Sequence, residues 1–360
     1  MPLEAFQPLT IAEVRRETAD SVSLLLDVPA DLAPDFAFTA GQHITLRAQI
    51  DGEDVRRNYS LCVAPHEGEL RVAVKSVAGG RFSRWAHAHL QPGHMIEVMP
   101  PHGSFTWAFD PTQAGEYLGV AGGSGITPIL ALLKTALVEE PRSRFTLLYS
   151  NRHSQSVMFL DQLADLKDRF LTRLTLHHFL SAEFDDDLDL FNGRLDRAKA
   201  DMVFDRLVDP ATLDAAFLCG PEGMMDAVEA SLLAHGVPQG AILSERFTTG
   251  PISAERAAAA QVLAEQAAGL TFSARLGGTR RAIVFDPALG NILDSARAAG
   301  LSAPYACKAG VCATCRARVT AGRVEMTTNY GLSADEVAAG YVLTCQSVPV
   351  GEGVAVDYDA

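Results

Sequence analysis

Residues 307–315 read CKAGVCATC, and one further cysteine, Cys345, follows Cys315 after a gap of 29 residues. The grouped cysteines therefore follow the spacing C-x4-C-x2-C with a distant fourth member, whereas Cys62 and Cys219 are isolated. Three thiolates on one tight loop and a fourth from a distant strand can enclose a metal site. This spacing is that of plant-type 2Fe-2S clusters. The predicted metal ligands are Cys307, Cys312, Cys315 and Cys345.

A structural zinc site is the alternative for these cysteines. Zinc sites usually pair their ligands as two C-x2-C units, whereas the second half here supplies one cysteine and the first gap is unusual for zinc. Small residues fill the loop, so backbone N–H groups can approach the sulfurs and offset their negative charge. These residues are Ala306, Ala309, Gly310 and Ala313. The pattern favours the iron–sulfur cluster.

The segments around this loop predict three domains. Residues 269–360 hold the cysteines in a sheet-rich unit, and the Ala-rich residues 249–268 before it are interpreted as a linker that is partly helical. In residues 111–248, short apolar strands alternate with segments of helical length, which predicts an open parallel sheet. Residues 1–110 carry short alternating segments separated by Pro, Gly and Asp, which predicts a small antiparallel barrel.

Composition narrows the class of protein. The chain has 360 residues, of which 48% are hydrophobic and 21% charged, so it can bury large cores. A net charge of −14 argues against nucleic-acid binding. Residues 269–360 contain eight basic and eight acidic residues, so the excess acidity lies before them. Without a membrane-length apolar run or a secretory signal pattern, we expect a cytoplasmic protein that binds no membrane.

Two stretches in the first predicted domain are suited to a flavin. In RNYS at 57–60, Arg57 and Tyr59 face the same way on a strand, so one can clamp a phosphate while the other stacks on a flat ring. In GGRFS at 79–83, a strand feeds a glycine turn and a helix start that can offer N–H groups to a pyrophosphate, with Arg81 and Ser83 nearby. An exposed strand and a plain capped turn are the alternatives.

The second predicted domain has a comparable turn. AGGSGITP at 121–128 follows a strand and opens a helix, so its glycines and helix start can approach a diphosphate, although it is not G-x-G-x-x-G. After the next strand, Ser150 and Arg152 stand where a carboxylate would favour NADH. An arginine can bind a 2′-phosphate, so NADPH is favoured and NADH stays possible. A structural turn and a surface arginine are the alternatives.

These stretches resemble the ferredoxin–NADP reductase superfamily, on RRNYSLC at 56–62, VKSVAGGRFSRWA at 74–86 and AGGSGITP at 121–128. The resemblance implies that the first two stretches bind FAD and the third binds the nicotinamide dinucleotide. The implied FAD residues are Arg57, Tyr59, Ser60, Lys75, Gly80, Arg81, Phe82 and Ser83. The implied nicotinamide residues are Gly122, Gly123, Gly125, Thr127, Ser150, Arg152, Cys219, Gly220 and Pro221.

The same resemblance implies catalytic roles for Ser60, Cys219 and Glu245. Ser60 would bond near the reactive flavin nitrogen, Cys219 of the LCGP stretch at 218–221 would lie beside the nicotinamide, and Glu245 would stabilise or relay charge. Phe247 would cover the flavin ring, a position that some relatives fill with tyrosine. For Cys219 the alternative is a small buried apolar residue.

Over essentially the whole chain, the sequence resembles the reductase subunits of phenylacetyl-coenzyme A epoxidases. The stretches that carry this resemblance are RRNYS, PYACKAGVCATCRARV at 304–319 and EMTTNYGLSADEVAAGYVLTCQSVP at 325–349. It implies an antiparallel Greek-key flavin-binding barrel, a Rossmann-like parallel α/β nicotinamide domain and a C-terminal β-grasp ferredoxin domain. Electrons would pass from NADPH to FAD to the 2Fe-2S cluster, and then to the di-iron oxygenase subunits of a multicomponent complex that degrades phenylacetate.

Three further hypotheses stay open. Lys308, Arg316, Arg318 and Arg323 flank the cluster loop and could meet an acidic patch on the oxygenase, or they could be ordinary surface charges. The chain could instead serve another oxygenase, such as a ketosteroid or aromatic hydroxylase. A non-catalytic iron–sulfur redox sensor is the third possibility, which the flavin and nicotinamide stretches disfavour.

Overall fold

The computed structural model describes residues 6–184, 189–247 and 254–360. The chain divides into two compact units, Met1–Phe247 and Thr248–Ala360, and each is considered by itself. The sequence DDDLD at 185–189 predicts a solvated loop, and residues 185–188 of it lie outside the described residues, as do the first residues of the predicted linker.

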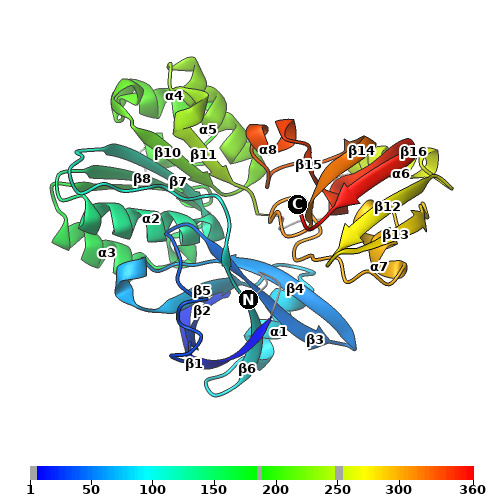
Figure 1. The fold of residues 1–360 in the computed structure, drawn as a ribbon. Coiled ribbons are helices and arrows are strands. Elements are labelled where there is room, and N and C mark those ends of the chain that lie inside the picture. Colours follow the sequence, from blue (N-terminus) through cyan, green and yellow to red (C-terminus); the bar gives the residue numbers. More distant parts are fainter. Residues whose placement is uncertain (1–5, 185–188, 248–253) are drawn as a thin grey trace. The chain divides into compact units, whose positions relative to one another are not determined.

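The first half of unit 1 is a six-stranded antiparallel barrel, as the sequence predicted (Figure 1). Its strands are β1 (Gln7–Thr18), β2 (Ser21–Asp27), β3 (His43–Ile50), β4 (Glu53–Ser60), β5 (Leu70–Lys75) and β6 (Met95–His102), in the order β4-β3-β6-β1-β2-β5. A bridge between Leu61 and Val72 joins the two ends of this order. Strand β6 returns after helix α1 (Arg81–His89) to pair with both β3 and β1, which makes the connection of Greek-key type.

The second half of unit 1 is a five-stranded parallel sheet in the order β11-β10-β7-β8-β9. Its strands are β7 (Glu116–Gly122), β8 (Arg144–Asn151), β9 (Leu174–Leu180), β10 (Ala215–Cys219) and β11 (Ile242–Glu245). Helices α2 (Ile126–Glu139) and α3 (Leu160–Arg169) cover one face, and α4 (Arg197–Arg206) and α5 (Glu222–Ala234) cover the other (Figure 1). The expected strand–helix alternation is confirmed, and α4 is an additional helix.

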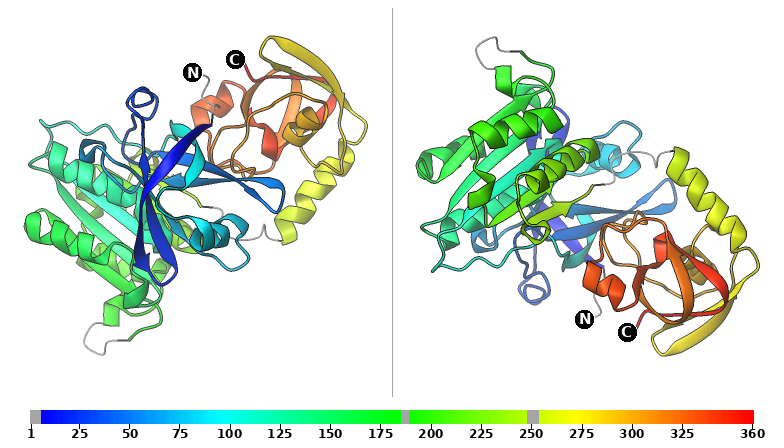
Figure 2. Two further views of the ribbon diagram at one scale, coloured as in Figure 1. Left: turned by 90° about the horizontal axis from the view of Figure 1, so that it is seen from below. Right: turned by 90° about the horizontal axis from the view of Figure 1, so that it is seen from above.

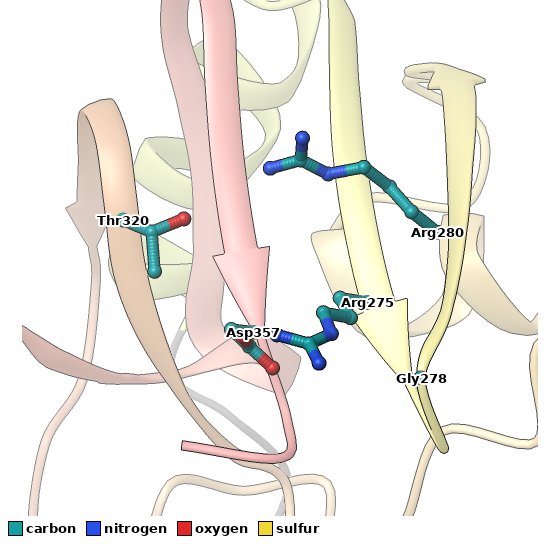
Figure 3. Close-up of a pocket in the computed structure, with 5 residues that line it drawn as sticks. All are labelled: Arg275, Gly278, Arg280, Thr320 and Asp357. Atoms are coloured by element: carbon teal, nitrogen blue, oxygen red, sulfur yellow. Dashed lines mark hydrogen bonds and ion pairs between the residues drawn. The ribbon is translucent and has the colours of Figure 1, made fainter.

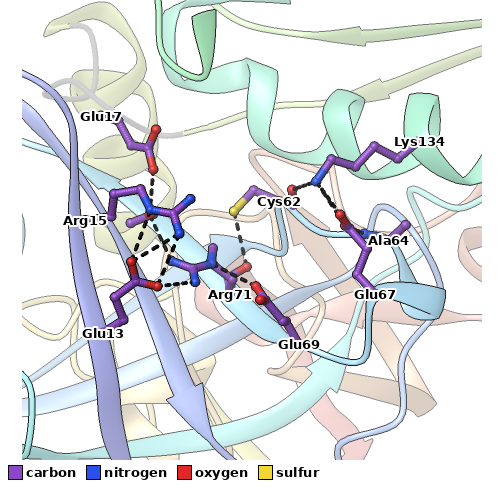
Figure 4. A network of polar contacts seen from close by, with 10 residues as sticks. Glu13, Arg15, Glu17, Cys62, Ala64, Glu67, Glu69, Arg71 and Lys134 are labelled. Carbon is purple, nitrogen blue, oxygen red and sulfur yellow. Dashed lines mark hydrogen bonds and ion pairs between the residues drawn. The ribbon is translucent and has the colours of Figure 1, made fainter. Parts of the chain in front are cut away.

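Helix α2 is buried along nearly its whole length because it packs between the parallel sheet and the barrel. One hydrophobic core joins Cys62, Ala73 and Phe105 of the barrel half to α2 and to the sheet. A lysine within such a helix needs a charged partner. Lys134 is 3% exposed, and its Nζ lies 2.9 and 3.0 Å from the two carboxylate oxygens of Glu67 (Figure 4). This ion pair therefore connects the two halves of unit 1.

Unit 2 is a five-stranded mixed sheet with short helices, the β-grasp arrangement that the resemblance implied. Its strands are β12 (Thr271–Leu276), β13 (Thr279–Val284), β14 (Arg316–Met326), β15 (Tyr341–Leu343) and β16 (Ser347–Asp357), in the order β13-β12-β16-β14-β15. Its helices are α6 (Ala254–Gln266), α7 (Ile292–Ala298) and α8 (Ala334–Ala338). Buried Ile292, Leu293 and Ala296 of α7 pack against the sheet.

Helix α6 occupies most of the predicted linker and leads into the hairpin of β12 and β13 (Figure 2). Ala264 and the following Ala267 are 1% and 2% exposed and belong to the hydrophobic core of unit 2. Alanine side chains allow this close approach because they need little space, and Leu263 of the same helix packs against this core as well.

Two further features concern the described part of the chain. None of its helices has the length and apolar character to cross a membrane.

An open pocket of about 450 Å³ lies on the sheet of unit 2, lined by Arg275, Gly278, Arg280, Thr320 and Asp357 (Figure 3). None of the predicted site residues lines this pocket, and Arg275 forms an ion pair across it with Asp357 at 3.2 Å.

Candidate functional site

The glycine turn after β7 is shaped by close packing as much as by flexibility. A side chain on Gly125 would place its Cβ 2.1 Å from the carbonyl oxygen of Cys219, and one on Gly122 would lie 2.4 Å from Pro221. These glycines let the β7 turn lie directly against the turn after β10. Gly123 differs, because its φ is +53° and open space surrounds the position of a Cβ. The sequence predicted that Gly122, Gly123 and Gly125 approach a diphosphate. Of these three glycines, Gly123 is the one with open space beside its Cα.

The remaining predicted nicotinamide residues lie at the carboxyl ends of the parallel strands, which is where open α/β sheets bind ligands. Gly220 and Pro221 follow β10, and Ser150 and Arg152 lie at and just after the end of β8. The Thr127 hydroxyl is buried and donates to the carbonyl of Ser124 at 3.0 Å, so it closes the turn.

Arg152 is exposed; its carbonyl accepts from the N–H of Ala182 at 2.9 Å, whereas its side chain has no hydrogen-bond or ion-pair partner among the described residues. A guanidinium with free donors in this place suits an anionic ligand.

In the flavin stretch of β4, more exposed and more buried side chains alternate as expected. Arg57 is exposed and donates to the carbonyl of Arg56, while Tyr59 is partly buried with its ring centroid 5.7 Å from that of Phe82. Burial raises the pKa of Tyr59, so the phenol stays protonated at neutral pH. Tyr59 and Phe82 thus place an aromatic pair between β4 and α1, beside the exposed arginine. This combination of ring and cation suits a flavin with its phosphates.

The start of α1 is the second part of the flavin stretch. Gly80 occupies the N-cap position, and a Cβ there would lie 2.4 Å from the Ser83 hydroxyl. Ser83 accepts a hydrogen bond from the N–H of Val77 at 3.3 Å, so this serine holds the turn. Arg81 forms an ion pair with Glu53 at 2.5 Å and would have to exchange this partner for a phosphate. Lys75 lies 3.7 Å from Asp20.

The two halves of unit 1 meet at the predicted catalytic residues. The Ser60 hydroxyl at the end of β4 donates to Glu245 Oε2 at 2.8 Å, although 185 residues separate them in the chain. Cys219 lies opposite Glu245 in the parallel register of β10 and β11. Burial, followed by the Glu245 charge, raises the pKa of the Cys219 thiol well above its usual range, so this thiol stays protonated. The structure thus brings Ser60, Cys219 and Glu245 to one place.

Phe247 follows β11 and is partly buried against the core that joins the barrel and the sheet. It ends the described part of unit 1, two residues beyond Glu245.

Sequence reasoning missed the histidines of this region. His43 Nδ1 lies 3.5 Å from Glu245 Oε1, and the ring centroids of His43 and His102 are 4.3 Å apart. His43 is opposite Ser60 in the β3–β4 register and opposite His102 in the β3–β6 register. Only the pairing of the barrel strands brings these residues to Glu245, so the sequence motifs around them contained no signal.

The four cysteines of unit 2 form two pairs. The backbone N–H of Cys307 donates to Cys312 Sγ at 3.5 Å, and the N–H of Ala309 donates to Cys307 Sγ at 3.3 Å. These bonds confirm that small loop residues let amides reach the sulfurs. Within each pair, one thiol donates a hydrogen bond to the other. The pKa values of Cys312 and Cys345 are thereby lowered and those of Cys307 and Cys315 raised.

The pairs are suited to a binuclear cluster. Within the described ranges, no group of three His, Cys, Asp or Glu side chains is placed as the ligands of a single metal ion. A 2Fe-2S cluster instead takes two ligands at each of its two irons. The loop also buries the hydroxyl of Thr314 between Cys312 and Cys315, where it lowers the pKa of the Cys312 thiol. The donor set therefore fits a 2Fe-2S cluster.

The cluster loop has unusual backbone geometry. Lys308 and Ala313 both have a φ of +52°, in the left-handed region that non-glycine residues rarely adopt. The Gln346 side chain donates to the carbonyl of Lys308 at 3.0 Å and so ties the loop to the segment that contains Cys345. Strain of this kind persists only where the surroundings require it, and it is common at ligand sites.

The four basic residues around the loop differ in their partners. Lys308 pairs with Asp294 and Arg316 with Glu336, each at 2.6 Å. Arg318 donates to the carbonyl of Ala339 at 3.2 Å. Arg323 is exposed and has no partner within the described residues. Half of the predicted docking cations are therefore paired with carboxylates inside unit 2.

Comparison with family models assigns a domain to each of these regions. Residues 8–107 match the oxidoreductase FAD-binding domain, and residues 120–230 match the oxidoreductase NAD-binding domain. Residues 275–350 match the 2Fe-2S iron–sulfur cluster binding domain. The three matches follow the order predicted from the sequence.

Two relatives match along nearly the whole chain, and so across all three domains. The chain is 45% identical over 358 residues to a subunit of the 1,2-phenylacetyl-CoA epoxidase of Escherichia coli (strain K12), with 99% of each chain covered. It is 32% identical over 354 residues to the ferredoxin reductase component of 3-ketosteroid-9-alpha-monooxygenase from Rhodococcus rhodochrous, with 97% and 96% covered.

A solved structure of phthalate dioxygenase reductase is similar over 98% of both chains, with 26% identity and a TM-score of 0.58. Its modular structure transfers electrons from pyridine nucleotides to a 2Fe-2S centre. The chain described here therefore belongs to the family of oxygenase reductases that combine an FAD-binding, an NAD-binding and a 2Fe-2S ferredoxin domain.

Proposed function

We propose that this oxidoreductase passes electrons from NADPH to the di-iron oxygenase subunits of a phenylacetyl-CoA epoxidase complex in the cytoplasm. The observation that carries the proposal is the 45% identity to the epoxidase subunit of Escherichia coli, which extends over 99% of both chains. That length includes all three domains of this chain. Neither nucleic acid nor membrane is among the proposed partners.

The domain order suits the conversion of an electron pair into single electrons. Bound FAD accepts a hydride pair and releases electrons singly, whereas a 2Fe-2S cluster carries one electron at a time. The protein contributes binding, orientation and electrostatics. In unit 1, the parallel sheet presents a nicotinamide site and the barrel a flavin site, and they meet at Ser60, Cys219 and Glu245.

Each group would be held by residues already described. Tyr59, Phe82 and Arg57, with the start of α1, would hold FAD, and Phe247 would cover its ring. The glycine turn, with Thr127 and the residues after β8 and β10, would hold the dinucleotide. The proposed cluster ligands are Cys307, Cys312, Cys315 and Cys345.

The preference for NADPH rests on Arg152. Its free guanidinium would bind the 2′-phosphate, and Arg152→Ala should raise the KM for NADPH about tenfold while the KM for NADH changes less than twofold. Arg206→Ala, an exposed arginine on α4 of the same domain, is the matched control. Steady-state ferricyanide reduction with both nucleotides measures the difference. Equal effects on both nucleotides would refute the 2′-phosphate role.

The oxygenase partner is tested by reconstitution. The holoprotein is combined with NADPH, phenylacetyl-CoA and the purified oxygenase subunits, and substrate-dependent NADPH oxidation and product are measured. A parallel reaction uses a ketosteroid hydroxylase, because its reductase is 32% identical along 97% of this chain. Product from phenylacetyl-CoA alone supports the proposal. Product with the ketosteroid hydroxylase alone would reassign the chain to that reaction.

A further inference from the structure

A buried carboxylate at the junction of the two halves of unit 1 is contacted on both of its oxygens. Ser60 donates to Glu245 Oε2 at 2.8 Å, and His43 Nδ1 lies 3.5 Å from Oε1. The side chains of His43 and Glu245 are 6% and 9% exposed. Because a buried carboxylate needs donors, the state of the His43 ring affects how Glu245 is held.

Neighbouring hydrogen bonds define the proton position on His43. The Thr45 hydroxyl donates to Asn58 Oδ1 at 3.0 Å, so the amide nitrogen of Asn58 faces His43 Nε2 at 3.1 Å. An amide nitrogen can only donate, so Nε2 must accept. A neutral imidazole then carries its proton on Nδ1, directed at Glu245. Three residues of the barrel thus produce one donor toward the carboxylate.

The other groups around this pair supply no cation. His102 packs edge-on against His43, and its Nδ1 donates to the carbonyl of Pro100 at 2.9 Å. Burial, with His43 as a second cause, lowers the pKa of His102 to about 3, so this ring is neutral at working pH. On the opposite strand, the Cys219 thiol stays protonated. Glu245 is therefore contacted by Ser60 on one carboxylate oxygen and by His43 on the other.

We infer that His43 is a positioning residue. It fixes the Glu245 carboxylate so that the Ser60 hydroxyl directs its hydrogen bond to Glu245. The inference rests on the proposal that Ser60 and Glu245 face the reacting end of the flavin. A hydroxyl that donates its one hydrogen bond to Glu245 can only accept hydrogen bonds from any other group. Ser60 would then accept a hydrogen bond from the N–H that the flavin gains on reduction. His43 thereby favours the reduced flavin without touching it.

The first experiment measures the proton position directly. Histidine nitrogen shifts of the ¹⁵N-labelled, FAD-loaded protein are recorded between pH 6 and 8.5, and His43 is assigned by its loss in His43→Gln. We expect Nδ1 to carry a proton and Nε2 to accept the Asn58 amide. Asn58→Asp places an acceptor opposite Nε2 and should move a proton onto that nitrogen. A wild-type ring that is protonated on Nε2 or doubly protonated would overturn the inference.

The second experiment measures flavin reduction by NADPH in anaerobic single turnovers. His43→Ala removes the contact with the Glu245 carboxylate and should slow reduction about tenfold, with nucleotide affinity changed less than twofold. The flavin midpoint potential should fall. His43→Gln, whose amide can donate, should recover part of the rate. His235→Gln, at the C-terminal end of α5 next to Asp205, is the matched control and should reduce at the normal rate.

The results separate this inference from the function on which it rests. Normal flavin reduction in Ser60→Ala would refute the proposed site itself. Slow reduction in Ser60→Ala together with a normal rate and potential in His43→Ala would refute only the role of His43.

Discussion

The cluster loop of unit 2 and the Ser60–Glu245 junction of unit 1 are both candidate redox sites, but they are built differently. The loop supplies three of its four ligands within residues 307–315. At the junction, one hydrogen bond joins groups that are 185 residues apart. The first site is encoded in local spacing, whereas the second exists only after a barrel and a parallel sheet have packed together.

The two sites also differ in how their polar groups are satisfied. At the junction, protein groups already bond one another, from Thr45 through Asn58 and His43 to Glu245. In the loop, sulfur atoms contact each other and the backbone is strained at Lys308 and Ala313. We therefore expect unit 2 to depend on its metal and unit 1 to keep its junction without one.

The largest expected effect comes from one cluster ligand. Cys312→Ser should abolish the visible absorbance of the cluster, because a missing thiolate leaves one iron without its second protein ligand. NADPH-dependent ferricyanide reduction should persist, because it needs only the residues of unit 1. Spectra, iron content and ferricyanide assays measure both. Cys62→Ala is the control, since Cys62 is buried in unit 1 and should leave the cluster unchanged. Loss of flavin reduction in Cys312→Ser would contradict the independence of the two sites.

Ser60→Ala removes the hydroxyl that donates to Glu245 at the junction. The rate of flavin reduction should fall on the order of 100-fold, because a pre-positioned hydroxyl is lost at the reacting end. The cluster spectrum should stay normal. Anaerobic stopped-flow absorbance gives the rate, and Ser302→Ala, an exposed serine of unit 2, serves as the reference. A change of less than threefold would show that the junction is structural only.

The ion pair between Lys134 and Glu67 tests how the two halves of unit 1 are held together (Figure 4). Lys134→Ala should lower the free energy of unfolding of unit 1 by about 3 kcal/mol, because it leaves a cavity and removes the partner of Glu67. Lys134→Met preserves volume and should cost about 1 kcal/mol or less. Urea unfolding followed by tryptophan fluorescence reports on unit 1, which contains Trp85 and Trp107. An equal loss of unfolding free energy in both variants would argue that the cavity left by alanine does not contribute to the effect.

The smallest expected effect is a pH dependence at the edge of the barrel. The hydrogen bond from Arg71 holds the pKa of Glu13 below its usual value of 4.5 (Figure 4). A carboxyl whose pKa is lower in the folded state stabilises the fold above pH 4.5, and this contribution is lost as the pH falls through the folded value. Because Glu13 is 39% exposed, we expect at most about 1 kcal/mol.

Urea unfolding of the wild type and of Glu13→Gln at pH 3.5 and 6 measures this contribution. The difference between the two proteins should be present at pH 6 and reduced at pH 3.5. A difference that is larger at pH 3.5 would mean that the sign of the linkage is wrong.

Much of the architecture could be predicted because it depends on local patterns. Short alternating segments in residues 1–110 predicted a barrel, and the strand, turn and helix around AGGSGITP at 121–128 were confirmed as β7, the glycine turn and α2. Helix α4 was missed because half of Arg197–Arg206 is charged and the helix buries only Ala200, Val203 and Phe204. Helix α6 was interpreted within a linker because alanines give a weak apolar signal, yet they pack closely.

By itself, the sequence determined the cluster spacing, the order of the three domains and the glycine turns, because each depends on residues that are neighbours along the chain. Only the tertiary structure decided that His43 bonds Glu245, that Gly122 and Gly125 are needed for packing, and that Lys134 meets Glu67. Those contacts join strands and helices that are distant in sequence, and their formation depends on strand register and on the burial of α2 between two layers.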